Sequence, residues 1–296
     1  MNILEVKKHM YFLLILSVVA ASFNSIVLNK SGANNKNCIF KFNFLCSLVW
    51  CIILFLTNNC NLHINQQILF WGALYGIAQS CFLIFKTAAM STGSVAVTTL
   101  VGNSSLLIST FASLVIWKES VTLTDILGLA LLCLSIFLCI YEKSEKRYSS
   151  KWKYYAFFFF IFAASVGLIY KGFGKAGNIE YCGDMMLFSS IIMTLINLII
   201  SFGIKEKYRL NKSVVSNTKR FLLFALGSGL LSCLYNRLNI ELAGDIDGII
   251  FFPCFNGGVV ILSALFSFIF LKEKLSLYQK TGICIGVISI CIIGIL

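Results

Sequence analysis

The stretch "IWKESVTLTDILG", residues 116–128, ends a run of mostly apolar sequence with a lysine and a glutamate side by side. The same arrangement returns at "FLKEKLSLYQKTG", residues 270–282, where Glu273 stands in the place of Glu119. Each glutamate follows a lysine, and each is followed nine residues later by a glycine. The pattern indicates that the chain contains a repeat.

The composition is typical of a membrane protein. Hydrophobic residues make up 58% of the chain and charged residues only 12%, whereas about a quarter of an ordinary soluble domain is charged. A crossing helix needs roughly 20 mostly apolar residues, so 296 residues accommodate about ten crossings with short connectors. No large soluble domain is left over.

Ten apolar runs are expected to form these spans. They are continuous rather than alternating, which predicts helices and not a barrel, because backbone exposed to lipid must satisfy its hydrogen bonds internally. The first run lacks a clear signal-peptide cleavage site and is interpreted as a mature helix. The spans are 10–28, 39–56, 68–85, 95–117, 126–141, 154–170, 185–202, 221–235, 249–271 and 281–296.

The hydrophilic connector at residues 141–155 divides the spans five and five, which predicts repeats over residues 1–145 and 146–296. At the offset that aligns Glu119 with Glu273, further identical pairs are Ser109/Ser263, Ser113/Ser267, Leu123/Leu277, Ser135/Ser289 and Ile136/Ile290. A slightly different offset pairs Lys86 with Arg237, Gly93 with Gly244 and Gly76 with Gly227. Because each repeat has an odd number of helices, the second is inverted, as is usual in secondary transporters that work by alternating access.

The order of these motifs resembles the EamA-like branch of the drug/metabolite transporter superfamily. The resemblance is carried by "WKES" and "LKEK", by the Ser/Thr-Leu pair after each, and by the glycine-containing helix "TGICIGVISICIIGIL". It implies an all-α membrane protein in which spans 1, 3, 4, 6, 8 and 9 surround a substrate cavity and spans 5 and 10 pack outside. The absence of acidic residues from the first span argues against the proton-coupled cation export of the small multidrug exporters in the same superfamily.

The two glutamates are expected to anchor structure rather than to bind substrate. They lie where spans 4 and 9 leave the membrane, and helix ends are where charges are tolerated. We therefore expect Glu119 and Glu273 to bond to nearby backbone or basic groups and to fix the turn into the next helix, on opposite faces of the membrane. Their neighbouring lysines are expected to reach the headgroups.

Substrate contacts are expected from amides on the spans that surround the cavity. Each amide needs a partner in hydrocarbon, which can be a neighbouring helix or a ligand. We expect three of these side chains to face one central cavity and the other two to lie near its walls. The first three are Asn103, Asn256 and Gln79, and the other two are Asn24 and Asn236.

Two further features bear on the cavity. Lys86 and Arg237 occupy matching places near the ends of spans 3 and 8, where they either reach the headgroups or, if they point inward, make the cavity suited to an anionic substrate. Pro253, the only proline, lies in span 9 shortly before two glycines. It predicts a kinked or partly opened helix, with tight packing at the glycines as the alternative.

The net charge of +12 is interpreted as membrane topology, and no nucleic-acid partner is expected. Of the 24 lysines and arginines, 18 fall in or beside the odd-numbered connectors, which places these connectors in the cytoplasm and both termini outside. Members of the resembled family more usually have cytoplasmic termini. We expect the protein to lie in a cell membrane, the inner membrane of a bacterium.

The resulting hypothesis is a multi-pass secondary transporter that exports a small metabolite without ATP, as a monomer or homodimer. The sequence contains no constellation of catalytic residues, no metal-ligand spacing and no cofactor motif, so no catalytic residue, metal or cofactor is assigned and an intramembrane enzyme is disfavoured. A flippase for a lipid-linked sugar and a membrane scaffold or receptor without transport activity remain the alternatives.

Overall fold

The computed structural model describes residues 3–30, 39–59, 61–92, 95–140, 150–177, 179–203, 218–271 and 276–295. Within these residues every regular element is a helix. Seven helices are long and apolar enough to cross a membrane, and three shorter apolar helices cover Val101–Ile116, Leu123–Leu138 and Leu277–Ile293. The chain is therefore an all-helical, multi-pass membrane protein.

The helices follow one another along the chain from α1 to α12. Their bounds are α1 (Ile3–Lys30), α2 (Ile39–Thr57), α3 (Gln66–Thr92), α4 (Val95–Ser104), α5 (Leu106–Ile116), α6 (Leu123–Ile140), α7 (Ser150–Lys175), the 3₁₀-helix η1 (Ile179–Tyr181), α8 (Cys182–Gly203), α10 (Thr218–Asp245), α11 (Gly248–Leu271) and α12 (Leu277–Ile295).

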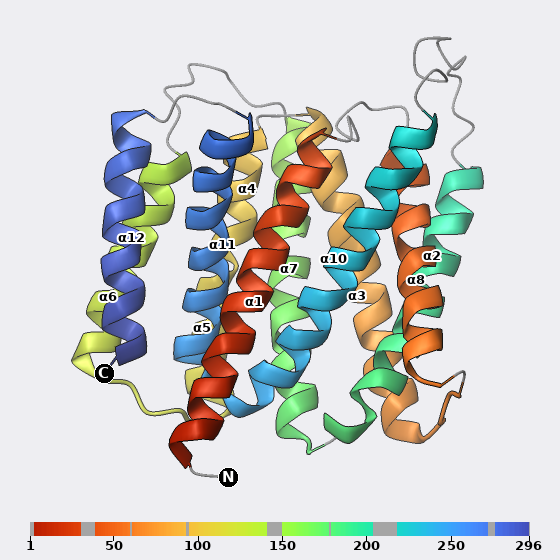
Figure 1. Cartoon of the computed structure of the whole chain (residues 1–296), viewed down its shortest axis with the longest axis horizontal. Helices are drawn as coiled ribbons and strands as arrows, with labels where there is room; N and C mark the ends of the chain where they lie inside the picture. The colour runs from red at the N-terminus through yellow and green to blue at the C-terminus, as the bar shows by residue number, and fades with distance from the viewer. Residues whose placement is uncertain are drawn as a thin grey trace.

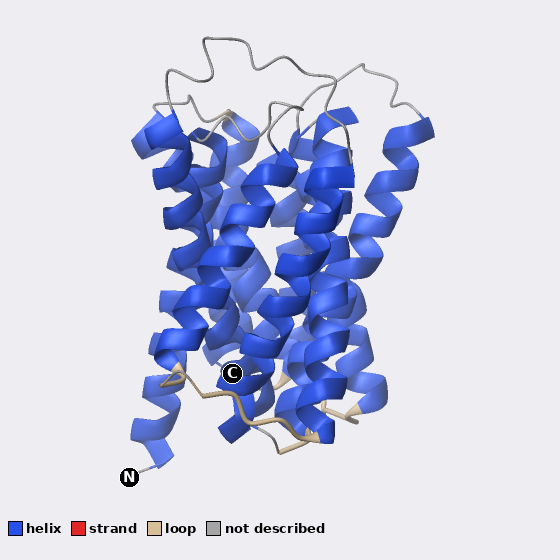
Figure 2. Cartoon of the chain, turned by 90° about the vertical axis from the view of Figure 1, so that its right-hand side faces the viewer, coloured by secondary structure: helices blue, strands red, loops and turns tan. Residues whose placement is uncertain are grey.

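The helices stand side by side, and successive helices run in opposite directions except that α5 continues the direction of α4 (Figure 1). The turns at residues 117–122 and 246–247 lie at the end of the bundle drawn at the bottom, which we call the lower end, together with the start of α1 and the end of α12 (Figure 1). Figure 2 shows the same bundle from the side, with loops between helices at this end. Glu273 and its neighbouring lysine lie outside the described residues.

Helices from the two parts of the chain pack against one another. Helix α1 packs on α10, α3 packs on α7, and α2 packs on α8. Helices α6 and α12 form a pair at one edge of the bundle (Figure 1). The core thus lies between helices from the first part of the sequence and helices from the second.

The α6–α12 pair is joined by two matching hydrogen bonds. The Ser135 hydroxyl donates to the Gly282 carbonyl at 2.7 Å, and the Ser289 hydroxyl donates to the Gly128 carbonyl at 2.6 Å. Both serines are fully buried. Because a hydroxyl in an apolar interior needs a partner, these bonds fix the two helices to each other.

Several helices extend beyond the expected spans, and one span is interrupted. Helix α7 continues past residue 170 to Lys175, and α10 continues past residue 235 to Asp245. The fourth expected span is divided at Ser105 into α4 and α5. The ninth span is not opened at Pro253, because α11 is helical from Gly248 to Leu271 with the proline in its second turn, and a kink there stays a prediction.

Candidate functional site

The centre of the helix packing contains a buried group of polar side chains from α3, α7 and α10. The Tyr75 hydroxyl donates to Asn236 Oδ1 at 3.1 Å and lies 3.2 Å from the Tyr170 hydroxyl, which also donates to Asn236 Oδ1. Tyr75 and Asn236 are each 1% exposed and Tyr170 is 6% exposed. We call these three residues the tyrosine–amide cluster.

The hydrogen bonding continues along α10 to α1. The Asn236 amide donates to the Ser232 carbonyl at 2.7 Å, and the Asn24 amide donates to the Ser232 hydroxyl at 3.0 Å. The Ser228 hydroxyl in turn donates to Asn24 Oδ1 at 2.7 Å. Residues four apart lie on one face of a helix, so Ser228, Ser232 and Asn236 form a polar stripe that faces α1, α3 and α7.

Helix α3 adds a second polar stripe. Gln79 lies one turn beyond Tyr75 and is 4% exposed, and its carbonyl oxygen is buried without a hydrogen-bond partner. Further along the same helix, the Lys86 ammonium lies 5.5 Å from the centre of the Phe82 ring, which is cation–π distance. Gln79 is therefore one of the amides expected at the site, and its carbonyl oxygen lies beside the cluster without a hydrogen-bond partner among the described residues.

The chemistry of this site is that of hydroxyls, amides and aromatic rings. No carboxylate, ammonium or guanidinium group bonds to the tyrosine–amide cluster among the described residues. Groups of this kind bind uncharged polar molecules through hydrogen bonds, and the aromatic rings supply apolar contact area. The site has the character of a ligand site more than of a catalytic centre.

The other expected contacts are distributed differently. Asn103 lies half-buried at the end of α4, and the Asn256 amide donates to the carbonyl of Phe252 in its own helix at 2.9 Å. Arg237 forms an ion pair with Glu241 one turn along α10, with 3.2 Å between Nε and Oε1. Of the five expected amides, the structure brings Asn24 and Asn236 into one bonded network, with Gln79 beside it.

The two basic residues, Lys86 and Arg237, lie apart in the bundle, and whether either contacts substrate stays a prediction. Helix α3 ends at the upper end of the bundle and α10 ends at the lower end, so Lys86 and Arg237 lie toward opposite ends (Figure 1). Arg237 is also neutralised by its ion pair with Glu241. Matching positions in two inverted repeats would be expected toward opposite ends in the same way.

The Glu119 side chain is an anchor at the lower end, as expected from its position after span 4. Its carboxylate forms an ion pair with the Lys171 ammonium of α7 and accepts a hydrogen bond from the Gly248 backbone N–H, at 2.7 Å, at the start of α11. Lys171 also donates to the Ile246 carbonyl at 2.9 Å. An anion at a helix N-terminus is favoured by the helix dipole and by the free N–H groups.

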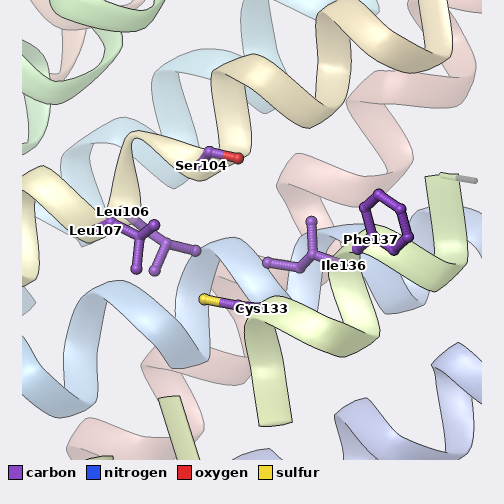
Figure 3. A pocket seen from close by; sticks show the side chains of 6 residues that line it. All are labelled: Ser104, Leu106, Leu107, Cys133, Ile136 and Phe137. Atoms are coloured by element: carbon purple, nitrogen blue, oxygen red, sulfur yellow. The ribbon is translucent and has the colours of Figure 1, made fainter. Parts of the chain in front are cut away.

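A small pocket opens beside the interruption of the fourth span. It has a volume of about 190 Å³ and lies between the α4–α5 junction and α6 (Figure 3). Its lining is mostly apolar and consists of Ser104, Leu106, Leu107, Cys133, Ile136 and Phe137. Among the described residues, no three or more His, Cys, Asp and Glu side chains gather where a metal ion could be held.

Sequence reasoning missed five residues of the site and its neighbourhood: Tyr75, Tyr170, Ser228, Ser232 and Lys171. A usable signal was present in the four-residue spacing of Tyr75 from Gln79, and of Ser232 from Asn236, since such pairs share a helix face. Lys171 had a signal of its own, because a lysine within helical apolar sequence needs a partner.

A bundle of apolar helices with an uncharged polar centre is suited to the class of membrane transporters for small solutes. A comparison with family models agrees, because residues 13–296 match the family described as "Sugar transport protein". The chain belongs to this family. That description does not name the EamA-like family, whose resemblance remains an expectation.

The fold is also shared with a solved structure that is described only as "Crystal structure of protein". The two superpose with a TM-score of 0.71 at 12% sequence identity, over 97% of each chain. The likeness extends to the fold alone. A comparison with curated proteins gave no match.

Proposed function

We propose that this protein is a secondary transporter that moves a sugar across a cell membrane by alternating access, in the direction of export. The observation that carries the proposal is the tyrosine–amide cluster, in which Tyr75 of α3 meets Tyr170 of α7 and Asn236 of α10. A buried, uncharged polar site between two parts of the chain is suited to a neutral solute, and a relative movement of those parts would expose it.

The proposed architecture is ten crossings in two inverted repeats, residues 1–145 and 146–296. Support comes from the α6–α12 pair, where Ser135 bonds to Gly282 and Ser289 bonds to Gly128. These are the residues that the sequence repeat equates, and a two-fold axis between the halves requires such reciprocity. The packing of α1 on α10 joins span 1 to span 8, and the packing of α3 on α7 joins span 3 to span 6. These two contacts are reciprocal in the same way, because exchanging the two repeats converts one into the other.

Sugar is the preferred substrate class for two reasons. The family is described as one of sugar transport proteins, and the hydroxyl and amide groups of the cluster match the hydroxyl groups of a sugar. An anionic metabolite is less favoured, because Lys86 and Arg237 lie toward opposite ends and Arg237 is paired. The motif order that resembles the EamA-like branch supports placing the chain in the drug/metabolite transporter superfamily, in the inner membrane of a bacterium.

Transport in a reconstituted system tests the proposal. The purified protein would be inserted into liposomes loaded with radiolabelled neutral sugars, and efflux would be measured with and without an ion gradient. We expect saturable efflux that does not need ATP and falls in the Tyr170→Phe variant. The proposal is wrong if no sugar in a broad panel moves and none raises the thermal stability of the protein.

Two alternatives predict different outcomes in the same liposomes. A flippase would move a fluorescent lipid-linked sugar between leaflets and leave free sugars where they are. A scaffold or receptor would bind a solute or partner without moving anything. Loading the sugar inside or outside liposomes of known protein orientation tests the proposed direction.

A further inference from the structure

The tyrosine–amide cluster has fewer hydroxyl hydrogens than close oxygen–oxygen pairs. Asn236 directs its amide nitrogen at the Ser232 carbonyl, at 2.7 Å, so its Oδ1 must face the tyrosines. Three close oxygen pairs result: Tyr75 with Asn236, Tyr170 with Asn236, and Tyr75 with Tyr170. Two hydroxyl hydrogens cannot satisfy three such pairs. The cluster is therefore short of donors.

The neighbouring residue on α3 increases the shortage. The Gln79 carbonyl oxygen is buried and has no hydrogen-bond partner among the described residues, and Gln79 follows Tyr75 by one helical turn. Leaving a buried acceptor unpaired costs free energy, which a ligand that donates a hydrogen bond would recover. Both the cluster and Gln79 thus offer lone pairs to whatever binds beside them.

We infer that the tyrosine–amide cluster and Gln79 form a subsite that accepts hydrogen bonds from the hydroxyl groups of an uncharged polyhydroxy substrate and excludes anionic sugars such as sugar acids and sugar phosphates. The inference rests on the proposed function and adds the substrate class. Hydroxyl groups supply the missing hydrogens, and they enter as the α3 tyrosine separates from α7 and α10.

An anion would be rejected because it adds hydrogen-bond acceptors to a subsite that already lacks donors. A carboxylate or phosphate brings acceptors only, so the hydroxyls of Tyr75 and Tyr170 could bind it only by turning away from Asn236. The Asn236 oxygen would then be unpaired, and no cation contacts the cluster among the described residues to offset the burial of charge. An ammonium group could donate, but no described carboxylate bonds to the cluster to balance its charge.

The test uses the full-length protein in liposomes and a series of sugars of matched size: the neutral sugar, its acid, its phosphate and its amino derivative. We expect the neutral sugar to be transported at least about 100-fold more efficiently than the acid or phosphate, since a site built for particular hydrogen bonds rejects a mismatched analogue strongly. The amino derivative should also be poorer than the neutral sugar.

Variants identify the subsite. Gln79→Leu should weaken binding of the neutral sugar about five- to tenfold, the effect of one hydrogen bond. Ser80→Ala is the matched control, because the Ser80 hydroxyl bonds to the Gly76 carbonyl of its own helix at 2.7 Å and should not affect binding. Thermal stability of each variant without ligand separates a binding defect from misfolding.

The outcomes separate the inference from the proposed function. If sugar acids or phosphates move as efficiently as neutral sugars, the inference is wrong and sugar transport stands. If neutral sugars move and Gln79→Leu behaves like Ser80→Ala, the subsite has been placed wrongly. If no sugar moves and none stabilises the protein, the proposed function fails and the inference fails with it.

Discussion

The ion pair between Glu119 and Lys171 gives the most direct test of how the lower end of the bundle is held together. The Glu119→Gln substitution keeps the shape of the side chain and an oxygen that can still accept from the Gly248 N–H. It removes the negative charge, so the Ile246 carbonyl is the remaining hydrogen-bond partner of the Lys171 ammonium among the described residues.

The magnitude follows from burial. The Lys171 side chain is 0% exposed and the Glu119 side chain is 6% exposed, and removing one partner of such a pair costs about 3–5 kcal/mol because a charge is left uncompensated. A loss of about 3 kcal/mol lowers the folding equilibrium constant by about 150-fold. The double variant Glu119→Gln/Lys171→Met contains no unpaired charge, and it should recover about half of this loss or more.

Equilibrium unfolding in mixed detergent micelles, followed by tryptophan fluorescence, measures the free energy of unfolding of the wild type, Glu119→Gln and the double variant. Transport of two different sugars by each folded variant measures substrate preference, which should be unchanged. A Glu119→Gln protein as stable as the wild type would refute the anchoring role. A change of preference at normal stability would instead show that Glu119 acts on the substrate.

Two other sets of substitutions have definite expected results. Gly174→Ala or Gly244→Ala should destabilise the protein, because an added Cβ would lie 2.4 Å (at Gly174) or 2.8 Å (at Gly244) from the Cα of the other glycine. Gly227→Ala is the control, since a Cβ there would have nothing within 4 Å. Equal free energies of unfolding for all three variants would contradict this prediction. Asn103→Ala and Asn256→Ala should reduce transport without changing the amount of inserted protein, and normal transport rates would remove these two amides from the site.

The sequence was informative where polar residues mark the end of a helix. The position of Glu119 after an apolar run predicted that its carboxylate would bond to backbone or basic groups, and the structure confirms this bonding. The partners could not be predicted, because Lys171 and Gly248 are distant in the sequence and only the packing of α7 and α11 brings them to the same turn. Glu273 lies outside the described residues, so its role stays a prediction.

The central site was harder to predict because hydropathy ends a span at its first polar residues. The expected spans stopped at Tyr170 and Tyr235, just before Lys171 and Asn236, although both helices continue. They continue because these polar groups find distant partners, Asn236 on α3 and α7 and Lys171 in the turns at the lower end. A one-dimensional pattern does not contain that information. The amides Asn24, Gln79 and Asn236 were predicted as candidates, whereas the tyrosine partners of Asn236 were not.

The helix interruption shows the same limitation. Pro253 was the visible signal for a break, but in the second turn of α11 it removes one backbone hydrogen bond and the helix tolerates it. The fourth span breaks at Ser105 instead, where the Ser105 N–H bonds to the Gly102 carbonyl at 3.2 Å, three residues earlier rather than four. No residue there is a strong helix breaker by itself.

The two hydrogen bonds of the α6–α12 pair have a further consequence. Ser135 donates to a glycine of α12 and Ser289 donates to the equivalent glycine of α6, so exchanging the two helices reproduces the contact. Such an exchange is the definition of an isologous interface, which normally joins two identical subunits. An isologous dimer forms only at a sufficient protein concentration. Here both partners belong to one covalent chain, so their association is intramolecular and this contact forms independently of the amount of protein in the membrane.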